Sequence, residues 1–541
     1  MRQKRIAPIV LFIFLWAVIS FQPASGWETT PHELEEYSHL TLRHETPHTK
    51  WARPYAGGKM KVLYFIFSDN QGMETYAREA VELMQRFDVD ITPVYWYRFY
   101  GSYWFGGVAG RRRINRLLKG EWDAFVFQEI SPDKLPDQAK PLLAKAVQKG
   151  SGCVLIGVDE GKVLEVMKRR KKLPDFLADT RAESAATSGK GRIVRLPKIP
   201  RIEYQVGWRV RYEQCQQQLG RCLLWAADRT PQMNMAVEAK SVQRKDLPRR
   251  HIKLRWQNAA RKPRCTVTLR RWDDRAISLG DFTCKSAHGE NTLQLPLQRA
   301  GRYYVEAIAE GTQGVEAFTT CSFDITATPS IKGIRTERDW VEPGDKLAGS
   351  VSTFDDKGCR VRVRLIDRQG RILTRTSLAR KAETQKETDE GTIRTRPFSF
   401  RIEPWTPMLV RLEAVLVDRR GEVVSEYRFV NISRRGRDRF NFVLWDFSGD
   451  QTLAPYMAQS MREKGVTSIL SSHEASPAAA AHNLTWCPWT GGQIQEKRAE
   501  SWNKPGRTSY FVNRMKPYRQ HGVYLYSLGD EGSVKGAGTG P

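Results

Sequence analysis

The residues best suited to chemistry stand near the C-terminus, where each closes a stretch with strand character. Asp446 closes FNFVLWDF, Trp489 closes LTWCPW, and Asp530 and Glu531 follow VYLYSL. Carboxylates transfer protons and accept hydrogen bonds from hydroxyl groups, and an indole ring stacks on the face of a pyranose. Cleavage of a glycosidic bond needs two carboxylates, one of them a proton donor with a raised pKa. Acids and an aromatic ring at strand ends therefore favour a sugar site.

The elements that must position these residues alternate between strands and helices over 437–541. The expected strands are Phe440–Phe447, Gly465–Ser471, Leu484–Trp489 and Val523–Leu528, and the expected helices are Leu453–Lys464, Ser476–His482 and Tyr510–Gln520. Four βα units of this length suit a TIM barrel, whose chemistry gathers at the C-terminal ends of its strands. The sequence therefore predicts the N-terminal half of an incomplete (β/α)8 barrel.

The segment Tyr526–Ser533 (YSLGDEGS) resembles the element that carries the general acid/base in glycoside hydrolase family 42, the β-galactosidase-like group. In that clan, a Glu that ends strand four is the acid/base, and a sugar-binding residue precedes it. The resemblance implies that Glu531 is the general acid/base and that Asp530 helps to hold the sugar or Glu531. Asp446 and Trp489, at the ends of the earlier strands, are further candidates for binding the carbohydrate. The commoner family pattern has Asn before the Glu, so Asp530 is a departure that bears on the sugar contact.

The second carboxylate of this clan is a Glu that ends strand seven, and this chain has no strand seven. Only about 105 residues follow residue 436, whereas a complete barrel takes roughly 250. We therefore expect a chain that is truncated after its acid/base, and we expect it to be inactive alone.

Residues 59–230 read as an alternating α/β domain with a parallel, flavodoxin-like sheet. Lys61–Phe67 (KVLYFIF) is a continuous apolar run, as expected for a strand buried on both faces. Ser131, followed by Pro132 and Asp133, has the pattern of a helix start. The domain resembles class I glutamine-amidotransferase-like accessory domains. Cys153 begins its strand instead of following it, and no His occurs between positions 48 and 251, so we expect Cys153 in the core and a non-catalytic domain.

Two β-sandwiches are expected next, over 245–330 and 331–435, where helical periodicity gives way to alternation. Val361–Leu373 and Arg411–Val424 read as hairpins that share Asp-Arg-x-Gly at the turn. The polar stretch Lys381–Glu390 is expected to be a loop. Such modules bind carbohydrate or space domains, and spacing is the interpretation favoured here.

The N-terminus has the order of a secretory signal: basic residues, an apolar run over Ile6–Phe21, and small residues at 24–26. The apolar run is shorter than the roughly 20 residues of a spanning helix. We therefore expect a signal peptide at 1–26, a leader segment at 27–58, a secreted or periplasmic protein, and no membrane span after cleavage.

The formal net charge of +27 raises the question of nucleic acid. The basic clusters are short and scattered, and no zinc-finger, helix-turn-helix or RNA-binding motif accompanies them, which argues against a nucleic-acid partner. No CxxC occurs among the eight cysteines, and neither a metal nor a cofactor is expected. Cys215 and Cys222 are expected on one helix, about 10 Å apart, too far for a disulfide.

Two functions compete on this evidence. The first is a retaining, β-galactosidase-like glycosidase that acts on a carbohydrate substrate. The alternative is a non-catalytic, extracytoplasmic carbohydrate-binding or scaffold protein, whose sugar affinity would survive the Glu531→Gln substitution. Family 42 relatives often assemble through the amidotransferase-like domain, so the resemblance also allows a homo-oligomer.

Overall fold

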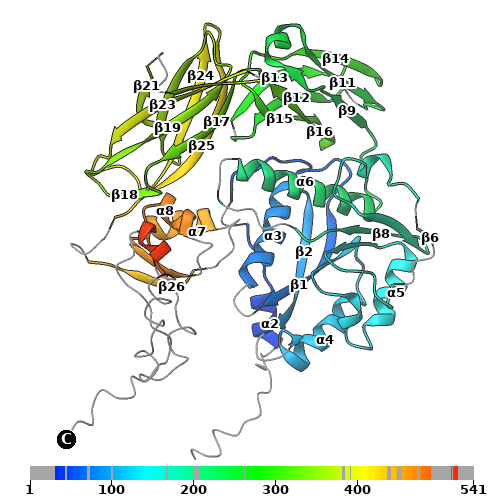
Figure 1. The fold of residues 1–541 in the computed structure, drawn as a ribbon. Coiled ribbons are helices and arrows are strands. Elements are labelled where there is room, and N and C mark those ends of the chain that lie inside the picture. The colour runs from blue at the N-terminus through cyan, green and yellow to red at the C-terminus, as the bar shows by residue number, and fades with distance from the viewer. Residues whose placement is uncertain are drawn as a thin grey trace, which may run out of the picture.

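The chain forms an α/β domain, two β-sandwiches and a small parallel sheet near the C-terminus (Figure 1). This computed structural model describes residues 31–42, 45–69, 73–98, 102–164, 168–169, 171–199, 204, 207–260, 262–273, 275–379, 384–389, 391–434, 440–447, 454–471, 476–488, 513 and 516–521. The expected signal peptide at 1–26 and the expected strand Val523–Leu528 lie outside these residues. The mixed α/β and β-rich multidomain class predicted from the sequence is confirmed.

The α/β domain is built on one eight-stranded sheet. Its strands are, in spatial order, β3 (Ser102–Trp104), β2 (Val89–Arg98), β1 (Met60–Asp69), β4 (Ala124–Gln128), β5 (Gly152–Ile156), β8 (Gly191–Leu196), β7 (Ser184–Ser188) and β6 (Lys168–Arg169). The five strands from β2 to β8 pair in parallel, and β3, β7 and β6 extend the edges in antiparallel fashion.

Helices cover both faces of this sheet, which explains the continuous apolar run of β1. Val62, Tyr64 and Ile66 belong to the core shared with α3 (Met73–Arg86) and α6 (Trp208–Ala226). Leu63 and Phe65 belong to the core on the opposite face, shared with α4 (Gly107–Leu117) and α5 (Lys140–Lys149). A strand sandwiched between helices must be apolar at every position, since successive side chains point to opposite faces.

The predicted helix start at Ser131 is wrong in its extent. Ser131 does accept a hydrogen bond from the Asp133 amide, but it caps only the short 3-10 helix Pro132–Lys134. The α-helix begins nine residues later, at Lys140. Leu135 and Ala139 precede it and are still buried in the core. The predicted cap is therefore present, but it caps a short 3-10 helix that precedes the α-helix.

Part of the segment expected as a leader is built into the domain. Helix α2 (Pro31–Tyr37) carries Glu35, which pairs with Arg113 on α4 at 3.2 Å. Trp51 and Tyr55 are buried in the same core as β1, with 0% and 5% exposure. Tyr55 also forms a parallel bridge to Val315 of the first sandwich. Residues 46–56, called the strap below, thus connect the α/β domain to the sandwich.

The first sandwich packs a five-stranded sheet against a three-stranded one. The larger sheet has the order β10 (Val242–Gln243), β16 (Gly314–Thr326), β15 (Gly301–Gly311), β12 (Arg264–Arg271) and β13 (Ala276–Thr283). The smaller sheet has the order β14 (Gly289–Gln294), β11 (His251–Gln257) and β9 (Asn234–Glu238). Alternating residues such as Ile252, Leu254, Val267 and Leu269 are fully buried between the sheets.

The second sandwich repeats this plan. One sheet has the order β17 (Ser330–Thr336), β19 (Lys346–Phe354), β23 (Gly391–Arg401) and β22 (Thr384–Thr388), and the other has the order β18 (Trp340–Val341), β25 (Gly421–Ile432), β24 (Leu409–Asp418), β20 (Arg360–Ile366) and β21 (Ile372–Ser377). The two predicted hairpins are confirmed as the antiparallel pairs β20/β21 and β24/β25. The expectation of a loop over Lys381–Glu390 is wrong, because Thr384–Thr388 pairs with β23 as an exposed edge strand. Charged side chains are a common feature of edge strands.

The C-terminal part contains strands β26 (Val443–Phe447), β27 (Ser468–Ser471) and β28 (Thr485–Pro488), with helices α7 (Ala454–Glu463) and α8 (Ser476–Ala481) between them. The 3-10 helix Lys516–His521 overlaps the end of the range Tyr510–Gln520, where an α-helix was expected. Cys215 and Cys222 share α6, as predicted. All eight cysteines lie in the described part of the chain and are unpaired there. No helix among the described residues has the length and apolarity to cross a membrane.

Candidate functional site: a strand edge and an arginine-lined cavity

Of the four predicted site residues, only Asp446 lies within the described part of the chain, on β26. Trp489, Asp530 and Glu531 lie outside it. Asp446 falls at a shift of register: Trp445 pairs with Leu470 and Phe447 pairs with Ser471 of β27. Asp446 is thus an extra residue in β26, a bulge of the type that re-aims side chains beside active sites.

The three strands of this small sheet end at one edge. The register aligns Phe447 with Ser471, and Ser471 with Pro488, so the carboxyl ends of β26, β27 and β28 form one edge. Trp489 is the next residue in the sequence after Pro488. Neighbouring strands lie about 4.8 Å apart, so the ends of β26 and β28 are separated by roughly 10 Å. This backbone arrangement puts Asp446 on the same edge of the sheet as the end of β28.

Helix α8 anchors this small sheet on the second sandwich. Ala480 and Ala481 pack against Met408 and Leu409. The side-chain oxygen of Asn483 accepts a hydrogen bond of 2.9 Å from the Met408 amide. The sheet itself is held by buried residues of both helices and strands, among them Ala458, Ile469, Ala479 and Trp486. The small sheet that carries Asp446 is therefore packed, through α8, against the second sandwich.

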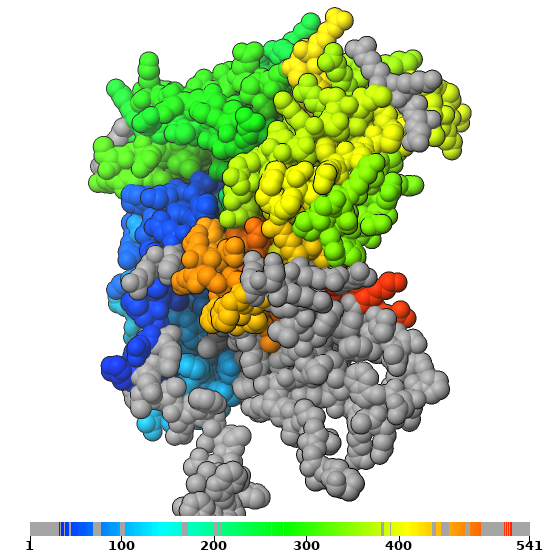
Figure 2. All heavy atoms as spheres, turned by 90° about the vertical axis from the view of Figure 1, so that its left-hand side faces the viewer, coloured from blue at the N-terminus to red at the C-terminus, as the bar shows by residue number. Residues whose placement is uncertain are grey.

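A cavity of about 610 Å³ lies where the four parts of the chain meet. In Figure 2, the orange segment with α7 and α8 lies where the yellow second sandwich and the blue α/β domain come together. Among the described residues, seven arginines and three carboxylates line the cavity, which gives a surplus of four positive charges. Its aromatic lining comes from Tyr204, Trp208, Phe429 and Tyr456, which belong to three different parts of the chain.

The floor of this cavity is a closed set of ion pairs. Arg299, with its side chain only 2% exposed, donates to Asp273 at 2.7 Å and to Glu413 at 3.1 Å. Arg364 donates to Glu413 at 2.6 Å and to Glu422 at 2.9 Å. These contacts join the first sandwich to the second. A buried charge is tolerated where each partner is neutralised in this way.

Burial and charge act in opposite directions on the groups around the floor. Burial raises the pKa of the Glu413 carboxyl, but the facing arginines, Arg299 first among them, lower that pKa below its ordinary value overall. Burial raises the pKa of the Tyr204 hydroxyl, and Arg368, Arg209 and Arg411 act against that rise. Burial, assisted by Arg368, lowers the pKa of His482 to about 3. Glu413 is therefore ionised and His482 neutral at neutral pH.

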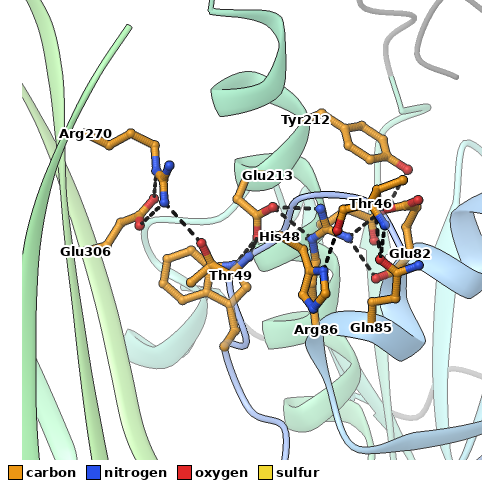
Figure 3. A network of polar contacts seen from close by, with 12 residues as sticks. Thr46, His48, Thr49, Glu82, Gln85, Arg86, Tyr212, Glu213, Arg270 and Glu306 are labelled. Carbon is orange, nitrogen blue, oxygen red and sulfur yellow. Dashed lines mark hydrogen bonds and ion pairs between the residues drawn. The ribbon is translucent and has the colours of Figure 1, made fainter. Parts of the chain in front are cut away.

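A second polar cluster, drawn in Figure 3, holds the strap and is structural. Arg86 on α3 and Glu213 on α6 form an ion pair of 2.7 Å, with side-chain exposures of 2% and 8%. Glu213 also accepts a hydrogen bond of 2.7 Å from the Trp51 indole. Thr49 accepts a hydrogen bond of 3.3 Å from Arg270 of the first sandwich. This strap network, made by Thr46, Thr49, Trp51, Glu82, Gln85, Arg86, Glu213, Arg270 and Glu306, connects three segments of the fold.

The sequence did not identify the arginine-lined cavity, since its residues come from segments up to about 280 positions apart. One signal was available. The first copy of the repeated Asp-Arg-x-Gly turn contributes Asp367 and Arg368 to the rim. Asp418 of the second copy is not among the residues that line this cavity, and it pairs with Arg244 at 2.8 Å. In both copies the Asp accepts backbone hydrogen bonds within its own turn. Among the described residues, no group of three or more His, Cys, Asp or Glu side chains could hold a metal ion.

No protein-family model matches the chain, and no curated protein matches it. Partial similarity exists to a glycosyl hydrolase family 2 member from Bacteroides cellulosilyticus, at 12% identity and a TM-score of 0.21, covering 52% of this chain and 43% of that one. Bacteroides uniformis β-glucuronidase 3 gives 14% identity and a TM-score of 0.20, covering 52% and 42%. A two-domain fibronectin type III segment of chicken tenascin gives 14% identity and a TM-score of 0.15, covering 37% and 97%.

The chain thus spans less than half the length of these two hydrolase structures. The hydrolase whose family is named belongs to family 2, whereas the sequence motif resembles family 42. TM-scores of 0.15–0.21 define no common overall fold, and these similarities assign no activity to this chain.

Proposed function

We propose that the protein is an exported, glycoside hydrolase-like protein of the β-galactosidase type that acts on O-glycosyl bonds of a carbohydrate. The observation that carries this proposal is the carboxyl edge of β26–β28, with Asp446 at a bulge and Trp489 following the last strand. An acid and an aromatic ring at the same edge of a parallel sheet fit sugar binding at the C-terminal face of a βα structure.

In this proposal Glu531 is the general acid/base. Its protonated carboxyl donates a proton to the glycosidic oxygen as the bond to the anomeric carbon breaks, and it later removes a proton from the attacking water. Asp530 and Asp446 accept hydrogen bonds from sugar hydroxyls, and the Trp489 indole stacks on the ring. A retaining reaction also needs a nucleophilic carboxylate about 5 Å from the acid/base.

The α/β domain is proposed to be an amidotransferase-like accessory domain without catalytic activity. Its five parallel strands follow the order 2-1-3-4-5, the order of flavodoxin-like sheets. Cys153 is fully buried within β5, and burial raises the pKa of its thiol. A nucleophilic cysteine needs an accessible thiolate, so Cys153 is a core residue.

A carbohydrate-binding protein without catalytic activity is the second candidate. The arginine-lined cavity favours it, because the described lining residues combine aromatic rings with hydrogen-bond donors. Ligand sites often lie at domain junctions of this kind.

The two candidates differ in their response to Glu531→Gln. The assay is hydrolysis of nitrophenyl β-galactoside by the protein expressed from its full coding region. The glycosidase proposal predicts turnover, and a fall in kcat/KM of about 10²–10⁴-fold in Glu531→Gln, since that is the usual contribution of a general acid. Glu337→Gln is the matched control, because Glu337 is exposed on the second sandwich. Turnover that Glu531→Gln leaves unchanged refutes the assigned role, and sugar binding without turnover favours the second candidate.

A further inference from the structure

Three arginines carry most of the surplus charge of the cavity. Arg275, Arg368 and Arg411 line it, and none has a carboxylate of the described chain within 4.0 Å. The nearest acid in sequence, Asp367, is engaged by the backbone and side chain of Arg371. The carboxylates of the floor are likewise engaged by Arg299 and Arg364. The described residues therefore supply the positive charge of these three arginines without an ion-pair partner for them.

Two of these arginines lie on neighbouring elements of one wall, since Arg411 on β24 pairs with Ile366 of β20, two residues before Arg368. Arg368 and Arg411 both act on the hydroxyl of Tyr204, and Arg368 also acts on His482. Arg368 is exposed at the rim on the β20/β21 turn, and Arg411 is half-buried on β24 with its Nε atom unpartnered. Like charges that converge in a cleft concentrate the field there and attract anions. The planar guanidinium group is suited to bidentate binding of a carboxylate or a sulfate.

The same wall carries a row of aromatic rings. The ring centroids of Phe429 and Tyr204 lie 5.9 Å apart, those of Tyr204 and Trp208 lie 6.4 Å apart, and those of Trp208 and Tyr456 lie 5.6 Å apart. The row runs from the second sandwich across the α/β domain to α7. Aromatic rings present an apolar face with polar tips, which suits the face and hydroxyls of a pyranose. The volume of about 610 Å³ lies within the usual range of small-ligand sites.

We propose that this cavity binds an acidic saccharide, whose carboxylate or sulfate group pairs with Arg368 and Arg411 while a sugar ring lies against the aromatic row. Among the described residues, the C-terminal lining of the cavity comes from Pro455, Tyr456 and Gln459 of α7 and from His482 after α8, and Asp446 is not part of it. The proposal therefore does not rest on Glu531 and holds for either candidate function.

Calorimetric titration of the full chain tests it with three probes: trigalacturonate, the neutral galactotriose, and inorganic sulfate. The expected result is binding of trigalacturonate, with galactotriose at least about tenfold weaker, since a hydrogen-bonded charge contributes that much or more. Arg368→Gln and Arg411→Gln should each raise the Kd about tenfold. Arg411→Gln tests the contact with the anionic group independently of Arg368, which is exposed at the rim.

Arg250→Gln is the matched control, since it removes one charge from an exposed arginine that does not line the cavity. Circular dichroism of each variant checks that its fold is retained. Equal binding of galactotriose and trigalacturonate overturns the role of charge. Equal binding of sulfate and trigalacturonate shows a general anion site and overturns the saccharide assignment. An equal loss of affinity for trigalacturonate in Arg250→Gln would attribute binding to the overall charge of the protein. That result, or unchanged affinity in both cavity variants, would overturn the assignment of this cavity as the binding site.

Discussion

Substitution of Glu213 by Ala is the most direct test of how the strap is held. The carboxylate of Glu213 accepts hydrogen bonds from Nε and Nη2 of Arg86 at 3.0 and 2.7 Å. It also accepts from the Trp51 indole at 2.7 Å and from the Thr49 amide at 3.3 Å. Removal of this group leaves the Arg86 guanidinium, which is almost fully buried, with Glu82 as its remaining carboxylate partner.

The size of the effect follows from that geometry. Burial alone lowers the pKa of Arg86, but the charge and hydrogen bonds of Glu213 raise it overall, so the ion pair outweighs the cost of burial. Loss of one partner of a buried pair costs about 3–5 kcal/mol. With a urea m-value of about 2 kcal/mol per molar, a loss of about 4 kcal/mol moves the unfolding midpoint down by about 2 M. Glu213→Gln keeps the shape and two acceptor sites, so its effect should be smaller.

Urea unfolding followed by circular dichroism at 222 nm is the appropriate assay, because the long helices belong to the α/β domain. Asp281→Asn is a control, since Asp281 pairs with Arg264 on the exposed face of the first sandwich and should leave the helical transition unchanged. A shift of the midpoint by less than about 0.5 M in Glu213→Ala, well below the value expected for a buried pair, would refute the reasoning.

Two further predictions concern titration and thiol chemistry. Burial lowers the pKa of His482 to about 3 in the folded protein, whereas the ordinary pKa of a histidine is about 6.5. Between about pH 6.5 and 3 the unfolded chain therefore binds one more proton than the folded chain. The free energy of unfolding must then fall with acidification across this window by about 1.4 kcal/mol per pH unit. His482→Gln should remove that slope between pH 6.5 and 5, above the range where most carboxylates titrate, and an unchanged slope in urea midpoints would contradict the assignment. Burial raises the pKa of all eight cysteine thiols, that of Cys222 to about 12 and that of Cys487 to about 11. We therefore expect slow labelling by a thiol reagent in the native protein and eight reactive thiols per chain in denaturant, whereas fewer than eight would indicate disulfides.

Patterns of local origin were predictable from the sequence. The apolar run KVLYFIF predicted β1, because a strand that is buried on both faces has no polar position. The Asp-Arg-x-Gly turns predicted two hairpins, because the Asp side chain accepts hydrogen bonds from the backbone of its own turn. Helix α4 was missed, since Arg111–Arg113 and two glycines mask its apolar face. Arg113 is nevertheless buried, where it donates to the Pro93 carbonyl at 3.0 Å and pairs with Glu35.

Features that depend on distant segments were not predictable. Arg86 and Glu213 are 127 positions apart, and nothing in either local pattern indicates the other. The arginines of the cavity are likewise ordinary strand and turn residues until the domains meet. At the candidate catalytic edge, the alternation of strand and helix patterns predicted where the strands end. The bulge at Asp446 was not predictable, because it depends on the pairing of β26 with β27. The roles of Trp489, Asp530 and Glu531 stay predictions.

The strap has a consequence for how the protein is made. The core of the α/β domain is completed by Val315 and Phe318 of β16, and Val315 exchanges backbone hydrogen bonds with Pro54 and Ala56. A ribosome must therefore synthesise about 260 further residues after the strap before its partner exists. During that time Trp51 lacks the Phe318 ring that it contacts at 5.9 Å in the finished fold. Apolar surface that is exposed during synthesis favours aggregation. We therefore expect the nascent chain to bind a chaperone until the first sandwich has emerged from the ribosome.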